Sequence, residues 1–205
     1  MKGTYYYPTK KSELWKMFRS ESLQRSLNRT PQWNIPRRNR LLKKLLGSID
    51  GNTYLVQLPF YTCYGCNIHV GKNFFANWNC VLMDHAPITI GDNVMLGPNV
   101  SILTTNHPIS KEYRRVFQTD DSFHPEKKGL REVIAPVTIG DDVWVGTGAV
   151  ILPGVTIGSG TVIAAGSVVT HDIPQNVLAA GVPCKVLREL NDEDSNIDRI
   201  TTMEG

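Results

Sequence analysis

Residues 137–172 repeat a six-residue pattern without interruption. Divided into sixes, the stretch is V-T-I-G-D-D, V-W-V-G-T-G, A-V-I-L-P-G, V-T-I-G-S-G, T-V-I-A-A-G and S-V-V-T-H-D. The third residue of every unit is Ile or Val. A period of six fits neither the 3.6-residue turn of an α-helix nor the two-residue alternation of a single strand. It is typical of a parallel β-helix, in which three short strands close one coil of eighteen residues.

The same pattern occurs less regularly upstream. Units begin at Ile68, and the phase resumes at Ile88 after an enlarged unit at residues 80–87. It then breaks for the polar and charged residues 106–136. Long loops inside a compact domain are usually either functional or disordered. Because this one lies between two coils that keep strict phase, we expect it to form a wall of a site. Counting from residue 53 predicts four to five coils.

Two segments before the repeats have helical spacing. Apolar residues predict one helix over residues 12–27 and a second over 36–46, which has Pro36 in its first turn and Gly47 after its end. The expected buried stripes are Leu14, Trp15, Phe18, Leu23 and Leu27 in the first helix, and Leu41, Leu42, Leu45 and Leu46 in the second. We expect the helices to cap one end of the β-helix or to pack on a neighbouring chain, because edge strands otherwise pair with other molecules.

The predicted fold is therefore mainly β. A parallel β-helix occupies residues 53–190, after an N-terminal helical segment at residues 1–52 and before a polar tail at residues 191–205. No run of eighteen apolar residues is present, and the first residues lack the apolar centre of a signal peptide. We therefore expect a cytoplasmic protein.

Charge and cysteine content narrow the possible partners. Residues 1–50 hold twelve Lys and Arg against three acidic residues, but the basic residues alternate with apolar ones at helical spacing. That pattern favours a solvated helix face, so we expect neither nucleic acid nor a membrane as partner. Cys63 and Cys66 have the spacing of half a zinc or redox site, but no second pair matches them. Two thiols in a turn or in the core are favoured instead.

Four stretches are similar to the maltose and galactoside O-acetyltransferase family. They are Y-G-C-N-I-H-V-G-K-N-F-F-A-N-W-N at 64–79, I-G-D-N-V-M-L-G-P-N-V at 90–100, N-H-P at 106–108 and A-A-G-V-P-C-K-V-L-R at 179–188. The likeness extends over residues 58–190. It implies a left-handed β-helix, a homotrimer with active sites between adjacent subunits, acetyl-CoA as co-substrate and a sugar hydroxyl as acceptor.

His107 is the candidate catalytic residue. Transfer of an acyl group to a hydroxyl needs a base, and imidazole serves near neutral pH. From the residues alone, a loop histidine that bonds a carbonyl is an equal alternative, and the resemblance favours the base. In the family this histidine is oriented through its other ring nitrogen. Glu132 falls near the place of a loop glutamate in relatives, and whether it orients His107 is left open.

The resemblance also implies the substrate sites. On the acceptor side it implies Asn77, Asp84, Cys63 and His85, where His85 replaces an acid of the galactoside enzymes. Asn77 is equally consistent with a corner residue in the left-handed conformation, and Trp78 with either a sugar contact or interface packing. On the acetyl-CoA side it implies Trp144, Gly146, Thr147, Ala165, Thr170, Lys185 and Arg188. The two basic residues suit phosphate oxygens, although two solvated charges after the last coil would be the default without the resemblance.

We therefore expect an acetyl-CoA-dependent acetyltransferase that needs no metal. A zinc enzyme of the carbonic-anhydrase type on the same fold requires three histidines around one ion. Position 112 is Glu, and His69, His85, His124 and His171 do not supply that set. A non-catalytic scaffold on the same coil is the other alternative. The acceptor, and the choice between O- and N-acetylation, stay open.

Overall fold

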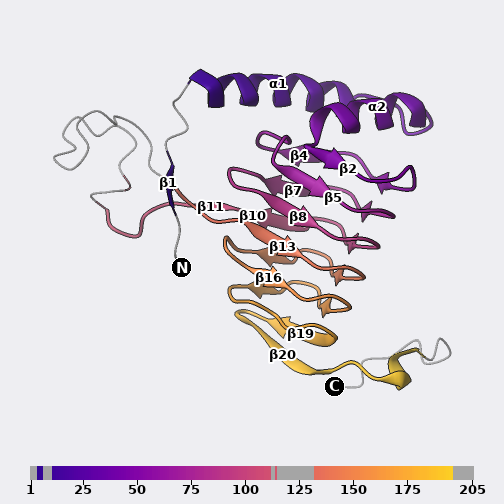
Figure 1. Cartoon of the computed structure of the whole chain (residues 1–205), viewed down its shortest axis with the longest axis vertical. Helices are drawn as coiled ribbons and strands as arrows, with labels where there is room; N and C mark the ends of the chain where they lie inside the picture. Colours follow the sequence, from indigo (N-terminus) through magenta and orange to yellow (C-terminus); the bar gives the residue numbers. More distant parts are fainter. Residues whose placement is uncertain (1–3, 7–10, 112–113, 115–131, 196–205) are drawn as a thin grey trace.

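The computed structural model describes residues 4–6, 11–111, 114 and 132–195, and most of them form a stack of short parallel strands (Figure 1). Three sheets run along the stack. Sheet 1 contains β2 (Ser48–Ile49), β5 (Ile68–Val70), β8 (Ile88–Ile90), β13 (Val137–Ile139) and β16 (Thr156–Ile157). Sheet 2 contains β3 (Leu55–Val56), β6 (Phe75–Ala76), β9 (Met95–Leu96), β14 (Trp144–Val145), β17 (Val162–Ile163), β19 (Val177–Gly181) and β20 (Cys184–Glu189). Sheet 3 contains β4 (Phe60–Thr62), β7 (Cys80–Met83), β10 (Ser101–Leu103), β15 (Val150–Ile151) and β18 (Val168–Val169).

The order of strands along the chain confirms the parallel β-helix. Each coil visits sheets 1, 2 and 3 in turn, which gives five complete coils and part of a sixth, begun by a bridge between Ile157 and Ile173. The predicted count of four to five coils is therefore low by about one, since β2 precedes residue 53 and β19 continues the stack. A final antiparallel strand, β20, pairs with β19 and closes that end of sheet 2.

The six-residue period decides which side chains fill the interior. All six third-position residues of the stretch 137–172 are buried, and they belong to one continuous core. Their neighbours in sequence point outward, as the alternation of a strand requires. The pairing of Thr138 with Thr156, and of Trp144 with Val162, confirms eighteen residues per coil in this stretch.

The earlier coils are longer than predicted. Ile68 pairs with Ile88, and Phe75 with Met95, so these coils take twenty residues. Most of the additional residues lie between sheet 3 and the next strand of sheet 1, at a corner that we call corner 3–1, and one lies between β2 and β3. Corner 3–1 is formed by residues 63–67, then 84–87, then the long insertion, and later 152–155 and 170–172. Corner 3–1 is thus the main place where the chain departs from the regular coil.

Two helices cover the first coil, as predicted (Figure 1). Helix α1 (Lys11–Asn28) caps the edge of β4 with side-chain amides. Gln24 accepts from the Thr62 N–H at 2.7 Å and donates to its carbonyl at 3.0 Å, and Asn28 does the same for Phe60 at 3.0 and 3.1 Å. These contacts reproduce the ladder of a missing strand and satisfy an edge that would otherwise be open.

The predicted stripe of α1 is wrong in its first half. Trp15 and Phe18 are 66% and 63% exposed, whereas the polar Ser20 is buried beside Leu27. The reason is that the edge of a sheet presents backbone N–H and C=O groups, so the contacting face of the helix needs polar partners. In α2 (Ile35–Leu45), by contrast, Leu42 and Leu45 are buried, as expected.

A small antiparallel sheet lies beside the stack at the insertion (Figure 1). β11 (Thr105–Asn106) leaves the end of the third coil, β12 (Glu132–Ile134) leads into β13 at the start of the fourth, and β1 (Thr4–Tyr6) pairs with the outer edge of β12. A short 3-10 helix, η1 (Asp192–Ser195), follows β20. Among the described helices, none is long and apolar enough to cross a membrane.

Candidate active site

His107 directly follows β11, at the mouth of the insertion on corner 3–1. Thr105 pairs with Ile134 and Asn106 with Val133 in the antiparallel register. The next pair in that register places Glu132 opposite His107. Directly opposite residues share one side of a hairpin and lie within side-chain reach. The register therefore brings a carboxylate to the side of the hairpin that carries the candidate base.

Glu132 is buried and contacts the neighbouring strand β11 and the corner loop that follows β7. Its Oε2 accepts a hydrogen bond from the Thr105 hydroxyl at 3.0 Å and lies 3.4 Å from Nε2 of His85. The side chains of His85 and Glu132 are only 7% and 8% exposed. The same Nε2 is 3.5 Å from Sγ of Cys63, and the imidazole packs edge-on against Tyr64 with ring centroids 5.3 Å apart. Three consecutive coils thus meet at one cluster.

Two residues expected on the acceptor side, Cys63 and His85, belong to this cluster. Burial, together with the nearby charges of Asp84 and Glu132, raises the pKa of the Cys63 thiol to about 12. The thiol therefore stays protonated near neutral pH and is a poor nucleophile. A lining residue fits this environment better than a covalent catalyst.

Asp84, the third residue expected there, is fully buried. Its carboxylate accepts from the backbone N–H groups of Cys63, Tyr64 and Asn67 at 3.0, 2.8 and 3.1 Å. Burial raises the pKa of Asp84, and these hydrogen bonds oppose the rise. The geometry argues against direct acceptor contact and indicates that Asp84 shapes the loop that carries Cys63.

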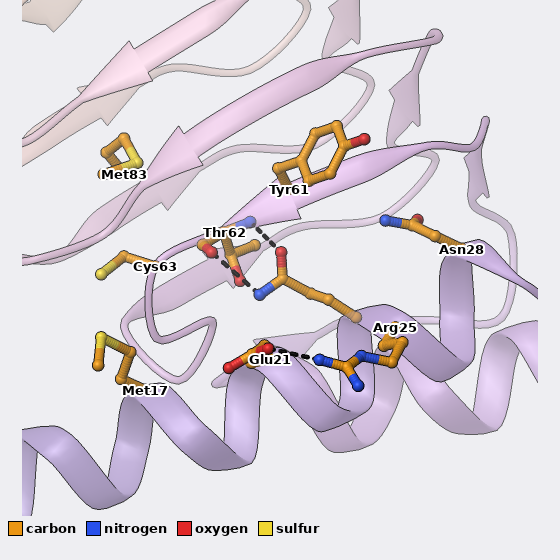
Figure 2. A pocket seen from close by; sticks show the side chains of 9 residues that line it. Met17, Glu21, Arg25, Asn28, Tyr61, Thr62, Cys63 and Met83 are labelled. Carbon is orange, nitrogen blue, oxygen red and sulfur yellow. Dashed lines mark hydrogen bonds and ion pairs between the residues drawn. The ribbon is translucent and has the colours of Figure 1, made fainter.

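A groove opens beside Cys63, between α1 and the outer face of sheet 3 (Figure 2). It has a volume of about 440 Å³. Its apolar walls come from Met17 on one side and from Tyr61 and Met83 on the other. Met17 was not singled out from the sequence, because only the packing of α1 over β4 brings residues 17 and 83 together.

Asn77, the fourth residue expected on the acceptor side, lies at a different corner. It follows β6 at the turn from sheet 2 to sheet 3, which we call corner 2–3. Its side chain accepts from the Trp78 N–H at 2.9 Å. The left-handed conformation falls on Asn79, so the corner interpretation of Asn77 in that form is wrong. Trp78 is about half exposed at the same corner.

Three of the seven residues expected to hold acetyl-CoA, Gly146, Thr147 and Ala165, lie in a column on corner 2–3. A Cβ on Gly97 would lie 2.7 Å from the Thr147 nitrogen, and one on Gly146 would lie 2.5 Å from the Ala165 nitrogen. Backbone therefore stacks on backbone without intervening side chains, and Trp144 is 53% exposed beside the column. The result is a strip of closely stacked main chain along the axis of the stack, buried at Gly146 and exposed at Thr147 and Ala165. Such a strip suits a long ligand with amide groups.

The remaining cofactor residues lie elsewhere. Thr170 is on corner 3–1, where its hydroxyl is 2.8 Å from Nδ1 of His171. Lys185 and Arg188 are exposed on β20. Arg188 forms a two-pronged ion pair with Asp194 at 2.6 and 2.7 Å. One chain therefore does not gather all seven residues into a single patch.

The described residues also show whether side chains that could bind a metal ion gather in one place. Among them, no group of three or more His, Cys, Asp or Glu side chains is placed to hold a metal ion. His124 lies outside the described residues. All four cysteines are free thiols.

The fold and the corner sites define a hexapeptide-repeat acyltransferase, and comparison with known proteins agrees. Residues 136–171 match the bacterial transferase hexapeptide model of six repeats, and residues 87–109 match the hexapeptide repeat of succinyl-transferase. The galactoside O-acetyltransferase of Escherichia coli K12 is 42% identical over 88% of this chain and 82% of its own length.

Solved structures point the same way. A maltose O-acetyltransferase from Clostridium difficile 630 superposes with a TM-score of 0.82, at 41% identity, over 93% of this chain and 94% of its own. A galactoside acetyltransferase in complex with coenzyme A superposes with a TM-score of 0.84, at 39% identity, over 94% of this chain and 90% of its own. The chain belongs to the maltose and galactoside O-acetyltransferase family and is an acetyltransferase.

Proposed function

We propose that the protein transfers the acetyl group of acetyl-CoA directly to a hydroxyl of a sugar or a similar small acceptor, with His107 as general base. The observation that carries the proposal is the register that sets His107 opposite Glu132 at the insertion, since the Glu132 carboxylate belongs to the cluster with His85 and Cys63. The family membership supports acetyl-CoA as donor, since one structural relative was solved with coenzyme A.

In the proposed reaction, the imidazole of His107 takes the proton of the acceptor hydroxyl while the oxygen attacks the thioester carbonyl. Backbone N–H groups stabilise the oxyanion that forms. The C–S bond then breaks, and the CoA sulfur leaves with the proton that the imidazolium returns. The Glu132 carboxylate, on the same side of the hairpin, orients the ring and stabilises its positive charge. No covalent acetyl-enzyme is required, in keeping with the raised pKa of Cys63.

The acetyl-CoA site that we propose follows the column on corner 2–3. Main-chain groups at Gly146, Thr147 and Ala165 bond the amides of the pantetheine arm, and Trp144 packs against it. Lys185 and Arg188, beyond the end of the column, bind phosphate oxygens. Thr170 contributes from corner 3–1.

We further propose a homotrimer with active sites between subunits. Asn77 and His107 lie on different corners, separated by one face of roughly five residues, or about 16 Å. A single sugar ring cannot bridge that distance on one chain, whereas a neighbouring copy can close it.

The outer faces of the sheets support association. The outward-facing side chains of sheet 1 are polar, whereas those of sheets 2 and 3 are mainly apolar. Large exposed apolar areas on a protein surface mark interfaces. Sheet 1 carries Ser48, His69, Thr89, Thr138 and Thr156. Sheet 2 carries Leu55, Phe75, Met95, Trp144, Val162 and Leu178. Sheet 3 carries Tyr61, Val81, Ser101, Val150 and Val168. Sedimentation equilibrium tests the trimer, which has three times the 22.9 kDa mass of the chain.

The reaction is tested by thiol release from acetyl-CoA across a panel of sugars and amino sugars, which also decides between O- and N-acetylation. His107→Ala should lower kcat by about 10²–10⁴-fold, with CoA binding by calorimetry unchanged. Unchanged turnover in that variant would remove the base role. A chain that shows no saturable CoA binding would instead be a scaffold. A cytoplasmic location is part of the proposal.

A further inference from the structure

His85 is a second imidazole in the site, and the proposed reaction gives it no role. It follows β7 on corner 3–1, in the coil before the one that carries His107. A histidine with 7% of its side chain exposed is held by its surroundings rather than by solvent. Those surroundings are specific: the Glu132 carboxylate at 3.4 Å, the Cys63 sulfur at 3.5 Å and the Tyr64 ring.

The contact with Glu132 links two coils. A carboxylate only accepts hydrogen bonds, so the tautomer of His85 that suits this contact is the one with a proton on Nε2, the atom that faces Glu132. Glu132 in turn accepts from the Thr105 hydroxyl at 3.0 Å. Thr105 and His107 are two residues apart at the start of the hairpin, so their side chains share the face on which Glu132 lies. The Glu132 carboxylate is thus held from one direction by His85 and from another by Thr105.

We propose that His85 is a positioning residue for His107. By holding the Glu132 carboxylate against the β11–β12 hairpin, it fixes the group that orients the general base. Without the imidazole, the carboxylate would lose one of its two restraints and could turn about its hydrogen bond with Thr105, so the His107 ring would be oriented less firmly. This inference rests on the proposed function, because it assigns His85 to the step that His107 performs.

The first test measures kcat and both KM values of the full-length protein with an acceptor that the unaltered enzyme uses. His85→Phe keeps an aromatic ring against Tyr64 but removes the contact with Glu132. It should lower kcat by about tenfold or more and leave the KM for acetyl-CoA unchanged. His85→Gln, whose amide nitrogen can take the place of Nε2, should stay within about threefold of the unaltered enzyme.

Coupling between the two residues separates positioning from a general loss of packing. Glu132→Gln should lower kcat to a similar extent. The kcat of the double variant His85→Phe with Glu132→Gln should then be little lower than that of the less active single variant. The matched control is His69→Phe, because His69 lies on the outer face of sheet 1, where its Nδ1 is 3.1 Å from the Ser48 hydroxyl. It should leave kcat unchanged. Multiplicative losses in the double variant, or His85→Phe within twofold of the unaltered enzyme, would overturn the proposal.

A second readout does not depend on turnover. In ¹⁵N long-range spectra of the histidine rings, the His107 signals, assigned with His107→Ala, should shift in His85→Phe and not in His69→Phe. If kcat falls while these signals stay in place, His85 acts by another route and the proposal is wrong. If the unaltered protein turns over no acceptor, the proposed function fails, yet the shift of the His107 signals still decides whether His85 positions that ring.

Discussion

The backbone N–H of Tyr64 donates a hydrogen bond to the Asp84 carboxylate across one coil, at 2.8 Å. The same carboxylate also accepts from the N–H groups of Cys63 and Asn67. Residues 63–67 form the first enlarged loop of corner 3–1, so their backbone donors lack the strand partners that a regular coil would supply. A single buried acid replaces those partners and thereby sets the position of the loop beside the candidate active site.

We predict that Asp84→Ala destabilises the fold by about 2–4 kcal/mol, because it leaves three backbone donors unsatisfied. Urea denaturation measures the change in the free energy of unfolding. Asp172→Ala is the matched control. Asp172 is exposed and accepts a backbone hydrogen bond from Thr156 at 2.7 Å, so its loss should cost about 1 kcal/mol or less. Equal costs for the two variants would contradict the special role of Asp84.

The amide cap on β4 gives a second prediction. Asn28→Ala removes both hydrogen bonds to Phe60 and should cost about 1–3 kcal/mol of unfolding free energy. It should also promote association, since it exposes part of a sheet edge. Denaturation and size-exclusion chromatography measure these effects. Gln32→Ala serves as control, because it removes a hydrogen bond between the exposed side chains of Gln32 and Gln57 and leaves the Gln32 carbonyl, which accepts from Arg38, in place. An Asn28→Ala protein as stable as the control would show that the edge needs no cap.

These contacts show where prediction from sequence succeeds and fails. The unbroken phase of residues 137–172 fixes each inward position, because a slip of one residue would turn a whole strand inside out. The β-helix, its coil length there and the burial of Ile139 or Ile163 therefore follow from the pattern alone. The enlarged early coils do not, since loop length at a corner leaves no periodic signal in the sequence.

The candidate site was predictable in kind but not in arrangement. The position of His107 at the start of the insertion, together with the family resemblance, identifies it from the sequence as the candidate base. Its position opposite Glu132 depends on the register across twenty-four intervening residues, which no local pattern specifies. For α1, apolar spacing suggested that Trp15 and Phe18 face the core, but the edge of β4 selects polar partners. The division of the expected residues between two corners likewise becomes visible only when the coils are stacked.

The Cys63 thiol yields a prediction about pH. Its pKa is raised to about 12, first by burial and then by the charges of Asp84 and Glu132. Because the thiolate is the reactive form, alkylation by iodoacetamide at pH 8 should be at least about a hundredfold slower than in the urea-unfolded chain. Mass spectrometry of the Cys63 peptide measures the rate.

Glu132→Gln tests the cause of that shift. It removes one of the charges that raise the pKa, so alkylation of Cys63 should become faster, while burial keeps the pKa above its ordinary value. Half-ionisation of Cys63 between pH 8 and 9 in the unaltered protein would contradict the prediction. It would also reopen the case for a covalent acetyl-thiol intermediate.

The ion pair between Arg188 and Asp194 gives the last prediction. Arg188 lowers the pKa of Asp194 to about 2, so the pair stays charged throughout the physiological range. A phosphate of CoA that binds Arg188 must compete with this carboxylate, because the guanidinium fork offers both donors to one acidic group at a time. Asp194→Asn should therefore tighten CoA binding by about two- to fivefold, and added salt should reduce the gain. Calorimetry measures both the affinity for CoA and its dependence on salt. Asp192→Asn, in the same turn η1, changes the net charge equally and should have a smaller effect. If both variants tighten binding alike, the gain reflects overall charge, and Arg188 does not hold a phosphate.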